Sequence, residues 1–465
     1  MTTTAGPPDT PTTTAEPPTP TPTSPGPWAQ LRPLVLRLHF YAGVLVAPFL
    51  LVVSLTGLAY VFSPQLSDLV HGEQLLAPDP AAPARPLDEQ VAAAVAALPD
   101  GTLADVVAHT DPTRSTAVTF DVAGLPADHQ RTVYVDPGSS RVLGTLDTWF
   151  GYPPLQTTLD DLHRHLLLGE PGRLYSEAAA SWLPVLVVGG LALWFGRRRA
   201  RRRDLVLPPM QAKPGRARIR GWHAVTALWL TVGLAFISVT GLTWSTYAGE
   251  RFQAVVTAFD GSTPALSTES VPARPGATPI GVGEAVDRAR AAGLVDRLVV
   301  TAPAGPGGVY TVAEDADGIP VQRDKVALDP YTGDVLETVL WADYPLLATL
   351  TTIGVSAHMG LLFGLPNQLL LAALAVGLLG VLFWGYRMAW LRRPTRAGAR
   401  LSAPAPRGTI RALTQPMAFL VVLAAVAYGW LAPLFGLSLL AFVLADAALG
   451  ALAHHHRRTR TRTRP

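Results

Sequence analysis

Residues 38–62 read LHFYAGVLVAPFLLVVSLTGLAYVF, a stretch of 25 residues without Asp, Glu, Lys or Arg. Roughly 20 residues, rising ~1.5 Å each, are enough for a helix to cross the ~30 Å hydrocarbon core of a bilayer. The stretch therefore predicts a transmembrane helix, with a histidine, His39, near its start. It is too long, and begins too deep in the sequence, for a typical cleaved signal peptide.

Further apolar stretches predict more crossings. Segments 178–196, 222–246 and 369–386 also lack Asp, Glu, Lys and Arg and are 18 to 25 residues long. Segment 417–445 is an uncharged run of 29 residues, longer than one upright helix needs. It forms either one helix or, broken near Pro433, a hairpin of two short spans. We expect a polytopic α-helical membrane protein with about six spans.

The charges separate along the chain and predict its orientation. Segments 197–220 and 387–411 carry ten and seven basic residues against one acid and none, and five Arg follow His456. The long segments 63–176 and 247–345 hold 29 of the 34 acidic residues and 13 basic ones, a net charge of −16. Because Lys and Arg stay on the cytoplasmic side, both termini are expected inside a bacterial plasma membrane. The basic runs are read as topology signals, so no nucleic-acid partner is expected.

Composition excludes several kinds of site. The chain contains no cysteine, which rules out disulfides, iron–sulfur clusters, thiolate zinc sites and covalent c-type haem. Residues 1–27 are almost wholly Thr, Pro, Ser, Ala and Gly and are expected to be disordered.

The sequence repeats itself within the spans. His39 lies 17 positions before Thr56, and His223 lies 17 positions before Thr240; each Thr is followed by Gly-Leu. The Thr-Gly pairs are expected to allow close helix approach. The repeat indicates that a unit of span, outside α+β domain and span occurs twice.

The segments between the spans repeat as well. Asp136-Pro137 and Asp329-Pro330 each predict a type I turn between two strands. His163 precedes a Gly and a Pro by six and eight positions, and His358 does the same. By topology, His39 and His223 lie near the inner face of the membrane, and His163 and His358 near the outer face.

Four histidines at matched positions suggest a cofactor site. A single histidine beside a span can simply hydrogen-bond to a backbone carbonyl, but two facing imidazoles can also bind one haem iron from both sides. Zinc fits less well, because no carboxylate or cysteine accompanies the inner pair. His165 could replace His163 or serve the same site. His71, His109 and His129 are expected at the surface, and 454–456 form a solvated tract.

The ordered set of motifs resembles the PepSY-associated transmembrane helix family. The set comprises the span with His39, the LHRHL segment at 162–166, the HMG segment at 358–360 and the DPYTG turn at 329–333. Relatives include iron-regulated membrane proteins and siderophore reductases that carry b-type haem. The resemblance implies two small extracytoplasmic PepSY domains and haem ligands on the membrane helices. The first turn departs from the pattern, because Ser140 stands where the second has Gly333.

Two functions of different classes follow. The first is a transmembrane electron conduit with two bis-His haem b groups, which takes electrons from quinol or a cytoplasmic reductant and reduces a ferric chelate or siderophore outside. The second is a membrane sensor or regulator whose outside domains bind a peptidase or another protein without redox activity. Metal handling without porphyrin is a third possibility. No catalytic side chain and no metal beyond haem iron are predicted.

The predicted organisation has eleven parts. They are a disordered N-terminus (1–27), span one (34–62), a first PepSY-like domain (63–160), a pre-span helix with span two (161–196), a basic cytoplasmic loop (197–220), span three (221–246), a second PepSY-like domain (247–345), a pre-span helix with span four (346–390), a second basic loop (391–412), a hairpin of spans five and six (413–452) and a His/Arg-rich tail (453–465).

Overall fold

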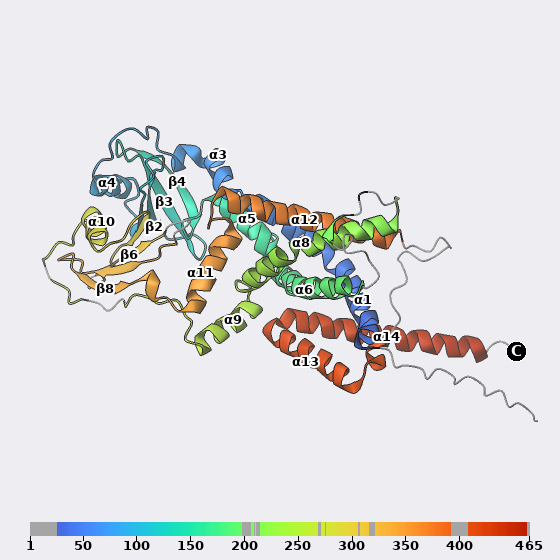
Figure 1. Cartoon of the computed structure of the whole chain (residues 1–465). Coiled ribbons are helices and arrows are strands. Elements are labelled where there is room, and N and C mark those ends of the chain that lie inside the picture. Colours follow the sequence, from blue (N-terminus) through green and yellow to red (C-terminus); the bar gives the residue numbers. More distant parts are fainter. Residues whose placement is uncertain are drawn as a thin grey trace, which may run out of the picture.

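The structure is a computed structural model in which a helical bundle carries a sheet domain at one end (Figure 1). It describes residues 26–197, 206–208, 210, 214–267, 271–274, 276–305, 307–315, 321–391 and 408–462, with the backbone alone at 409 and 453–462. The predicted disordered N-terminus lies outside these residues up to position 25, as do large parts of both basic loops and the side chains of the tail.

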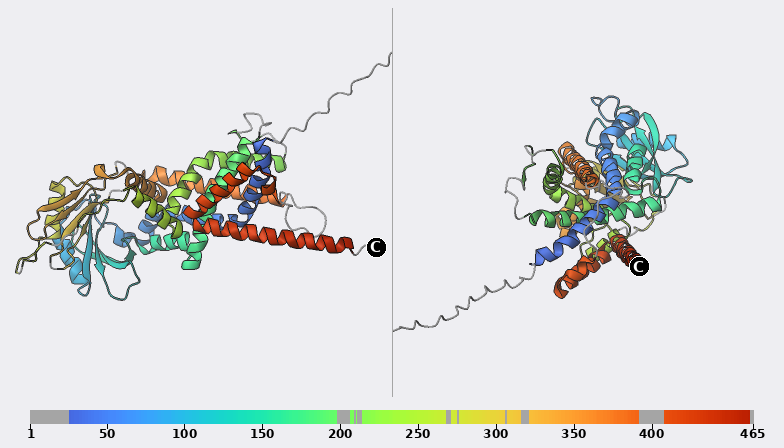
Figure 2. Two further views of the ribbon diagram at one scale, coloured as in Figure 1. Left: turned by 90° about the horizontal axis from the view of Figure 1, so that it is seen from below. Right: turned by 90° about the vertical axis from the view of Figure 1, so that its right-hand side faces the viewer.

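Among the described residues, seven helices form the bundle and four shorter ones lie between the bundle and the sheet. The bundle consists of α1 (Pro27–Leu45), α2 (Ala47–Tyr60), α6 (Glu170–Phe195), α8 (Arg216–Leu242), α12 (Leu365–Trp390), α13 (Gln415–Leu431) and α14 (Pro433–Arg462). The shorter helices are α3 (Ser63–Leu75), α5 (Pro154–His165), α9 (Tyr247–Ala258) and α11 (Leu346–Met359). Figure 2 shows α14 running beside the bundle and past its end, away from the sheet.

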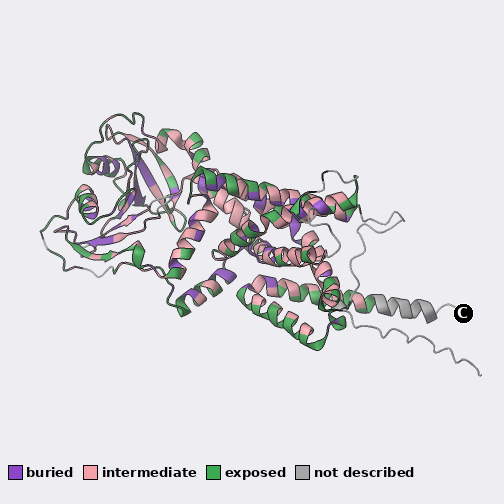
Figure 3. Ribbon diagram, in the orientation of Figure 1, coloured by how far each residue is buried: buried purple, intermediate pink, exposed green. Residues whose placement is uncertain are grey.

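The bundle has the length and surface of a membrane domain. Within the described residues, α6, α8, α12 and the first 20 residues of α14 are each long and apolar enough to cross a bilayer, and α1 with α2 adds a fifth span if that bent pair is one crossing. Two further apolar helices, α11 and α13, are shorter than these spans, with 14 and 17 residues. Large apolar side chains such as Val232, Leu370 and Phe419 are more than 60% exposed, as expected of a lipid-facing surface (Figure 3). The protein is therefore a multi-pass membrane protein.

The first predicted span is not one straight helix. Helices α1 and α2 meet at Val46 with a bend of 56°. Pro48 explains the break, because its nitrogen has no hydrogen to donate to the carbonyl of Val44, four residues earlier. That carbonyl instead accepts a hydrogen bond from the Tyr386 hydroxyl of α12, 3.0 Å away. The predicted span over 34–62 therefore consists of two helices that meet at a bend.

The last apolar run is broken where the sequence indicated. Helix α13 ends at Leu431, and α14 begins at Pro433. The hairpin is fixed to the bundle by Arg37, which is 5% exposed and forms an ion pair with Asp446 of α14 at 2.5 Å. Trp182 of α6 also donates a hydrogen bond to Ser438.

Segments 63–176 and 247–345 share one antiparallel sheet of eight strands, in the order β4-β3-β2-β1-β5-β6-β7-β8. The sequence predicts two separate domains, but β1 pairs with β5 and places Val106 opposite Val300. An unpaired strand edge is a ready partner for another such edge, so joining the halves satisfies the backbone of both. The strands are β1 (Thr102–Ala108), β2 (Thr116–Asp121), β3 (His129–Val135), β4 (Val142–Trp149), β5 (Leu298–Thr301), β6 (Tyr310–Glu314), β7 (Lys325–Leu328) and β8 (Val335–Val339).

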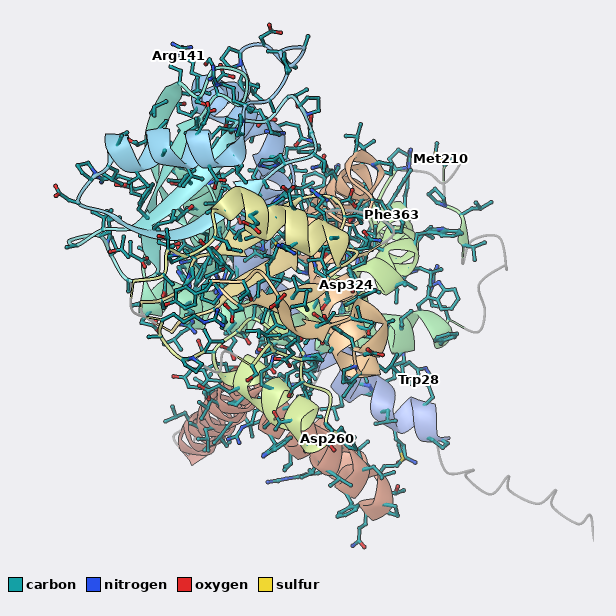
Figure 4. All side chains as sticks on the ribbon, turned by 90° about the vertical axis from the view of Figure 1, so that its left-hand side faces the viewer. Trp28, Arg141, Met210, Asp260, Asp324 and Phe363 are labelled. Atoms are coloured by element: carbon teal, nitrogen blue, oxygen red, sulfur yellow. The ribbon has the colours of Figure 1, made fainter. Side chains whose placement is uncertain are left out.

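One hydrophobic core serves both halves of the sheet. Helices α4 (Leu87–Ala97) and α10 (Val282–Ala291) pack against it with Ala94 and Ala285, which are fully buried. Phe120 and Val312 contribute from the strands of the two halves. Figure 4 looks onto this end of the molecule, with Arg141 at the rim of the sheet domain.

The chain turns at both Asp-Pro pairs, but the closing backbone hydrogen bond joins residues four apart and not three apart as in the predicted type I turn. The backbone N–H of Ser140 donates to the carbonyl of Asp136, and that of Gly333 donates to Asp329, each at 2.9 Å. Ser140 and Gly333 have φ values of 56° and 70°, a left-handed conformation that glycine adopts at little cost. The first turn thus has the same backbone shape as the second, although Ser140 adopts the left-handed conformation less readily than Gly333.

Candidate functional site

The inner pair of histidines meets inside the bundle. His39 of α1 and His223 of α8 have ring centroids 6.3 Å apart and ring planes at 82°. Small residues make room for them: a Cβ at Gly190 of α6 would lie 3.4 Å from His39 Cε1, and one at Gly385 of α12 would lie 3.6 Å from His223 Cε1. Four helices therefore enclose the two rings.

The inner rings can offer free nitrogens. His223 Nδ1 lies 3.0 Å from the carbonyl oxygen of Val381. Because a carbonyl can only accept, Nδ1 carries the hydrogen, which leaves Nε2 of the neutral ring with a lone pair. His39 Nδ1 is buried and has no hydrogen-bond partner of normal geometry among the described residues. The ring of His39 also interacts with the backbone of Leu186. A bound ligand is one way to satisfy a buried ring nitrogen that lacks a well-aligned partner.

The outer histidines are positioned by matched turns. His163 lies near the end of α5 and His358 near the end of α11. Each helix is followed by a Gly with positive φ before the next span, Gly169 at 62° and Gly364 at 57°. A Pro in the first turn of each following helix has the φ that a helix start needs. The repeated six-residue interval between His and Gly therefore builds the same turn twice.

Each outer histidine contacts a threonine of the preceding span. His163 Nδ1 lies 3.0 Å from the Oγ1 of Thr56, and His358 Nδ1 lies 2.7 Å from the Oγ1 of Thr240. The adjacent glycines leave space for the rings, since a Cβ at Gly57 would lie 3.0 Å from His163 Cε1. The structure thus brings the rings of His39 and His223 together and sets His163 and His358 against equivalent Thr-Gly pairs.

His165 occupies a different position from the four paired histidines. Its Nδ1 lies 3.3 Å from Asp161, one turn earlier in α5. Its Nε2 is buried without a hydrogen-bond partner among the residues described. Its replacement of His163 as a ligand stays a prediction.

The ring separation of His39 and His223 fits a bis-imidazole iron site. Two imidazoles that bind one metal at about 2 Å each have ring centres roughly 6 Å apart, close to the 6.3 Å of His39 and His223. No group of three or more His, Cys, Asp or Glu able to hold a metal ion occurs in the described part of the chain. Two nitrogen donors suffice for haem, because the porphyrin supplies the other four.

An open groove lies beside the helix that carries His163. It has a volume of about 580 Å³ and is bordered by strands β3 and β4 and by α5. Arg131 and Asp147, which form an ion pair at 2.7 Å, stand on its strand side, and Asp161 on its helix side. This groove was not predicted, because its walls come from segments that only the fold brings together.

Sequence comparison now places the chain among known proteins. Residues 36–393 match the family described as PepSY-associated TM region. The chain belongs to this family. The hairpin of α13 and α14 lies beyond the matched residues. No curated protein matches the chain.

Proposed function

We propose that this PepSY-associated membrane protein is a transmembrane electron conduit that holds two haem b groups and reduces ferric chelates, such as siderophores, for iron uptake. The observation that carries the proposal is that four partly buried histidines lie at equivalent places of the two halves, with the rings of His39 and His223 in contact. Bound haem would supply reversible one-electron chemistry, which no side chain here provides.

The residues of the chain would each have a defined part. His39 and His223 would hold the inner haem, and His163 and His358 the outer one, each through Nε2. The groove beside α5 offers an acceptor a place near the outer pair, and its volume falls in the range typical of small-molecule sites. Reduction releases iron because hard oxygen donors hold Fe(III) better than the softer Fe(II).

The orientation belongs to the same proposal. The sheet domain lies at one end of the bundle, so both outside segments share a side (Figure 1). The excess of Lys and Arg in the connecting segments supports a bacterial plasma membrane with both termini cytoplasmic and six crossings. The matched element order supports an internal duplication and two PepSY-like units joined in one sheet. Electrons would come from membrane quinol or a separate cytoplasmic reductant.

An absorption spectrum tests the proposal directly. Protein purified from haem-supplied cells is expected to show b-type bands after dithionite reduction. His39→Ala and His163→Ala should each remove about half of the bound haem, because each breaks one pair. His71→Ala, in α3, is a matched control and should leave the haem content unchanged. Absence of haem from the wild-type protein under these conditions would overturn the proposal.

The alternative function is a sensor or regulator, favoured by the large exterior domain with its own core. Because one core joins the halves, the two outside segments should be tested within the full chain and not as separate pieces. A stable protein partner, together with an unaltered phenotype when all four paired histidines are replaced, would favour regulation over electron transfer.

A further inference from the structure

We infer that Thr56-Gly57 and Thr240-Gly241 are positioning residues that hold the two outer imidazoles in one tautomer, with Nδ1 protonated and Nε2 free to bind a metal. We call each Thr-Gly pair with its histidine a cradle. The identity of the ligand at Nε2 rests on the proposed haem function, but the cradle itself does not.

The carbonyls beside the threonine hydroxyls favour one direction for each Thr–His hydrogen bond. Thr56 Oγ1 lies 2.9 Å from the carbonyl of Val52, and Thr240 Oγ1 lies 2.8 Å from the carbonyl of Phe236. A hydroxyl has one hydrogen to donate, and a carbonyl can only accept. With that hydrogen directed to the helix carbonyl, the oxygen lone pairs accept from His Nδ1–H, and the metal-binding lone pair remains on Nε2.

The glycines complete the cradle by their lack of a side chain. A Cβ at Gly57 would lie 3.0 Å from His163 Cε1 and 3.3 Å from its Nδ1. A Cβ at Gly241 would lie 3.4 Å from His358 Cε1. The imidazole edge therefore lies directly on the helix backbone, where the preceding Thr hydroxyl can reach Nδ1.

The arrangement differs from an ordinary helix threonine. Thr231 of α8 also directs its hydroxyl to the carbonyl four residues earlier, at 2.9 Å from Ala227, but no histidine contacts it. The His contact is found at the two Thr-Gly pairs that share the 17-residue offset from the inner histidines. The inner ring of His223 instead uses the Val381 carbonyl for the same purpose. Partners that orient a ligating histidine in this way also raise its basicity.

The first test needs no haem. In the haem-free full-length protein with ¹⁵N-labelled histidine, the wild-type His163 and His358 signals should show protonated Nδ1 and unprotonated Nε2, assigned by their loss in His163→Ala and His358→Ala. Thr56→Val and Thr240→Val keep the side-chain shape and remove the acceptor, so the signal of the facing histidine should shift towards a mixture of tautomers. Thr56→Ser and Thr240→Ser should restore it, and Thr231→Val should change neither signal.

The second test uses the haem-loaded protein. Each valine variant should weaken haem binding at the outer site by about 10–100-fold, with the inner site unchanged. The reduction potential of the outer haem should rise, because a less basic ligand stabilises the oxidised iron less. Unchanged tautomer signals in both valine variants would overturn the cradle even if haem binds. Fixed tautomers in a wild-type protein that binds no haem would instead overturn the haem proposal and leave the cradle standing.

Discussion

The two halves of the bundle reach the same outer site by different helix paths. In the second half, α8 runs unbroken from Arg216 to Leu242, and His223 and Thr240 lie on one helix. In the first half, a 56° bend at Val46 separates His39 from Thr56, yet the 17-residue offset is the same. The contact between imidazole and Thr hydroxyl is kept in both. The comparison teaches that the local cradle, and not a common helix axis, is what the two halves share.

The largest expected effect concerns an ion pair that only the first half has. Arg37 lies two residues before His39, and the residue two positions before His223 is Gly221. Asp446→Ala should lower the free energy of unfolding by about 3–5 kcal/mol, because it leaves a buried guanidinium without its carboxylate. Thermal unfolding in detergent would measure this loss.

A double variant controls for the lost packing around this ion pair. Arg37→Met with Asp446→Leu removes both charges and should recover most of the stability. Equal losses in the single and double variants would show that the pair does not fix the hairpin.

The second prediction sets Gly57→Ala against Gly241→Ala. Alanine is more favourable than glycine inside a helix by up to about 1 kcal/mol, so helix propensity alone would make both substitutions stabilising. At Gly57 the new Cβ would press on His163 at 3.0 Å, a strain of about 1–3 kcal/mol, whereas the 3.4 Å at Gly241 is ordinary contact. Gly57→Ala should therefore be destabilising and disturb the His163 ¹⁵N signal, and Gly241→Ala should be neutral or stabilising. Equal effects on the two histidine signals would contradict this difference between the halves.

Much of this site could be predicted from sequence, because its signals are local. Matched offsets located His39, His223, His163 and His358, and apolar runs placed them at membrane depth. The threonine partners were visible at the same offsets, but a Thr-Gly pair is more often a helix contact, so their bonds to imidazole nitrogens were missed.

Contacts between distant segments were not predictable in the same way. Tyr386 satisfies a carbonyl 342 positions away, and Arg37 pairs with a residue 409 positions away. The pairing of β1 with β5 is of the same kind, since either half could have formed its own closed sheet. Such contacts depend on how whole elements pack and leave no periodic signal in the chain.

A smaller effect is expected where the halves of the sheet meet. Burial, followed by the charges of Arg297 and Arg114, lowers the pKa of His109 from 6.5 to about 4, although Asp111 and Asp315 oppose the shift. His109 is partly buried, as are His71 and His129, which were also expected at the surface. The folded protein keeps it neutral down to about pH 4, while the unfolded chain protonates it below about pH 6.5. Its contribution to stability is therefore present above pH 6.5 and lost as the pH falls towards 4.

His109→Gln should flatten this part of the pH profile. The measurement is the difference in unfolding free energy between wild type and variant across pH 4 to 7, so that the carboxylates common to both cancel. His129→Gln, at the start of strand β3, serves as the comparison variant. A difference that does not change with pH would refute the role of His109.

The smallest effect should come from the two Asp-Pro turns. Ser140 has φ 56°, a conformation that costs a non-glycine residue roughly 1–2 kcal/mol, and its buried hydroxyl has no hydrogen-bond partner among the described residues. Ser140→Gly removes this strain but gives the unfolded chain more conformational freedom, which costs about 0.4–1 kcal/mol of stability. The free energy of unfolding should therefore rise by at most about 1 kcal/mol.

The reverse substitution in the second turn, Gly333→Ser, should lower the free energy of unfolding, and by more than Ser140→Gly raises it. Gly333→Ser introduces the same strain at φ 70°, and its Cβ would lie 3.0 Å from Nε of Arg288, a contact that a flexible side chain must yield. Thermal unfolding of both single variants gives the two values. If Gly333→Ser instead stabilised the protein, the two turns would have to differ in more than the residue with positive φ. Ser and Gly would then not be equivalent at this position of the two turns.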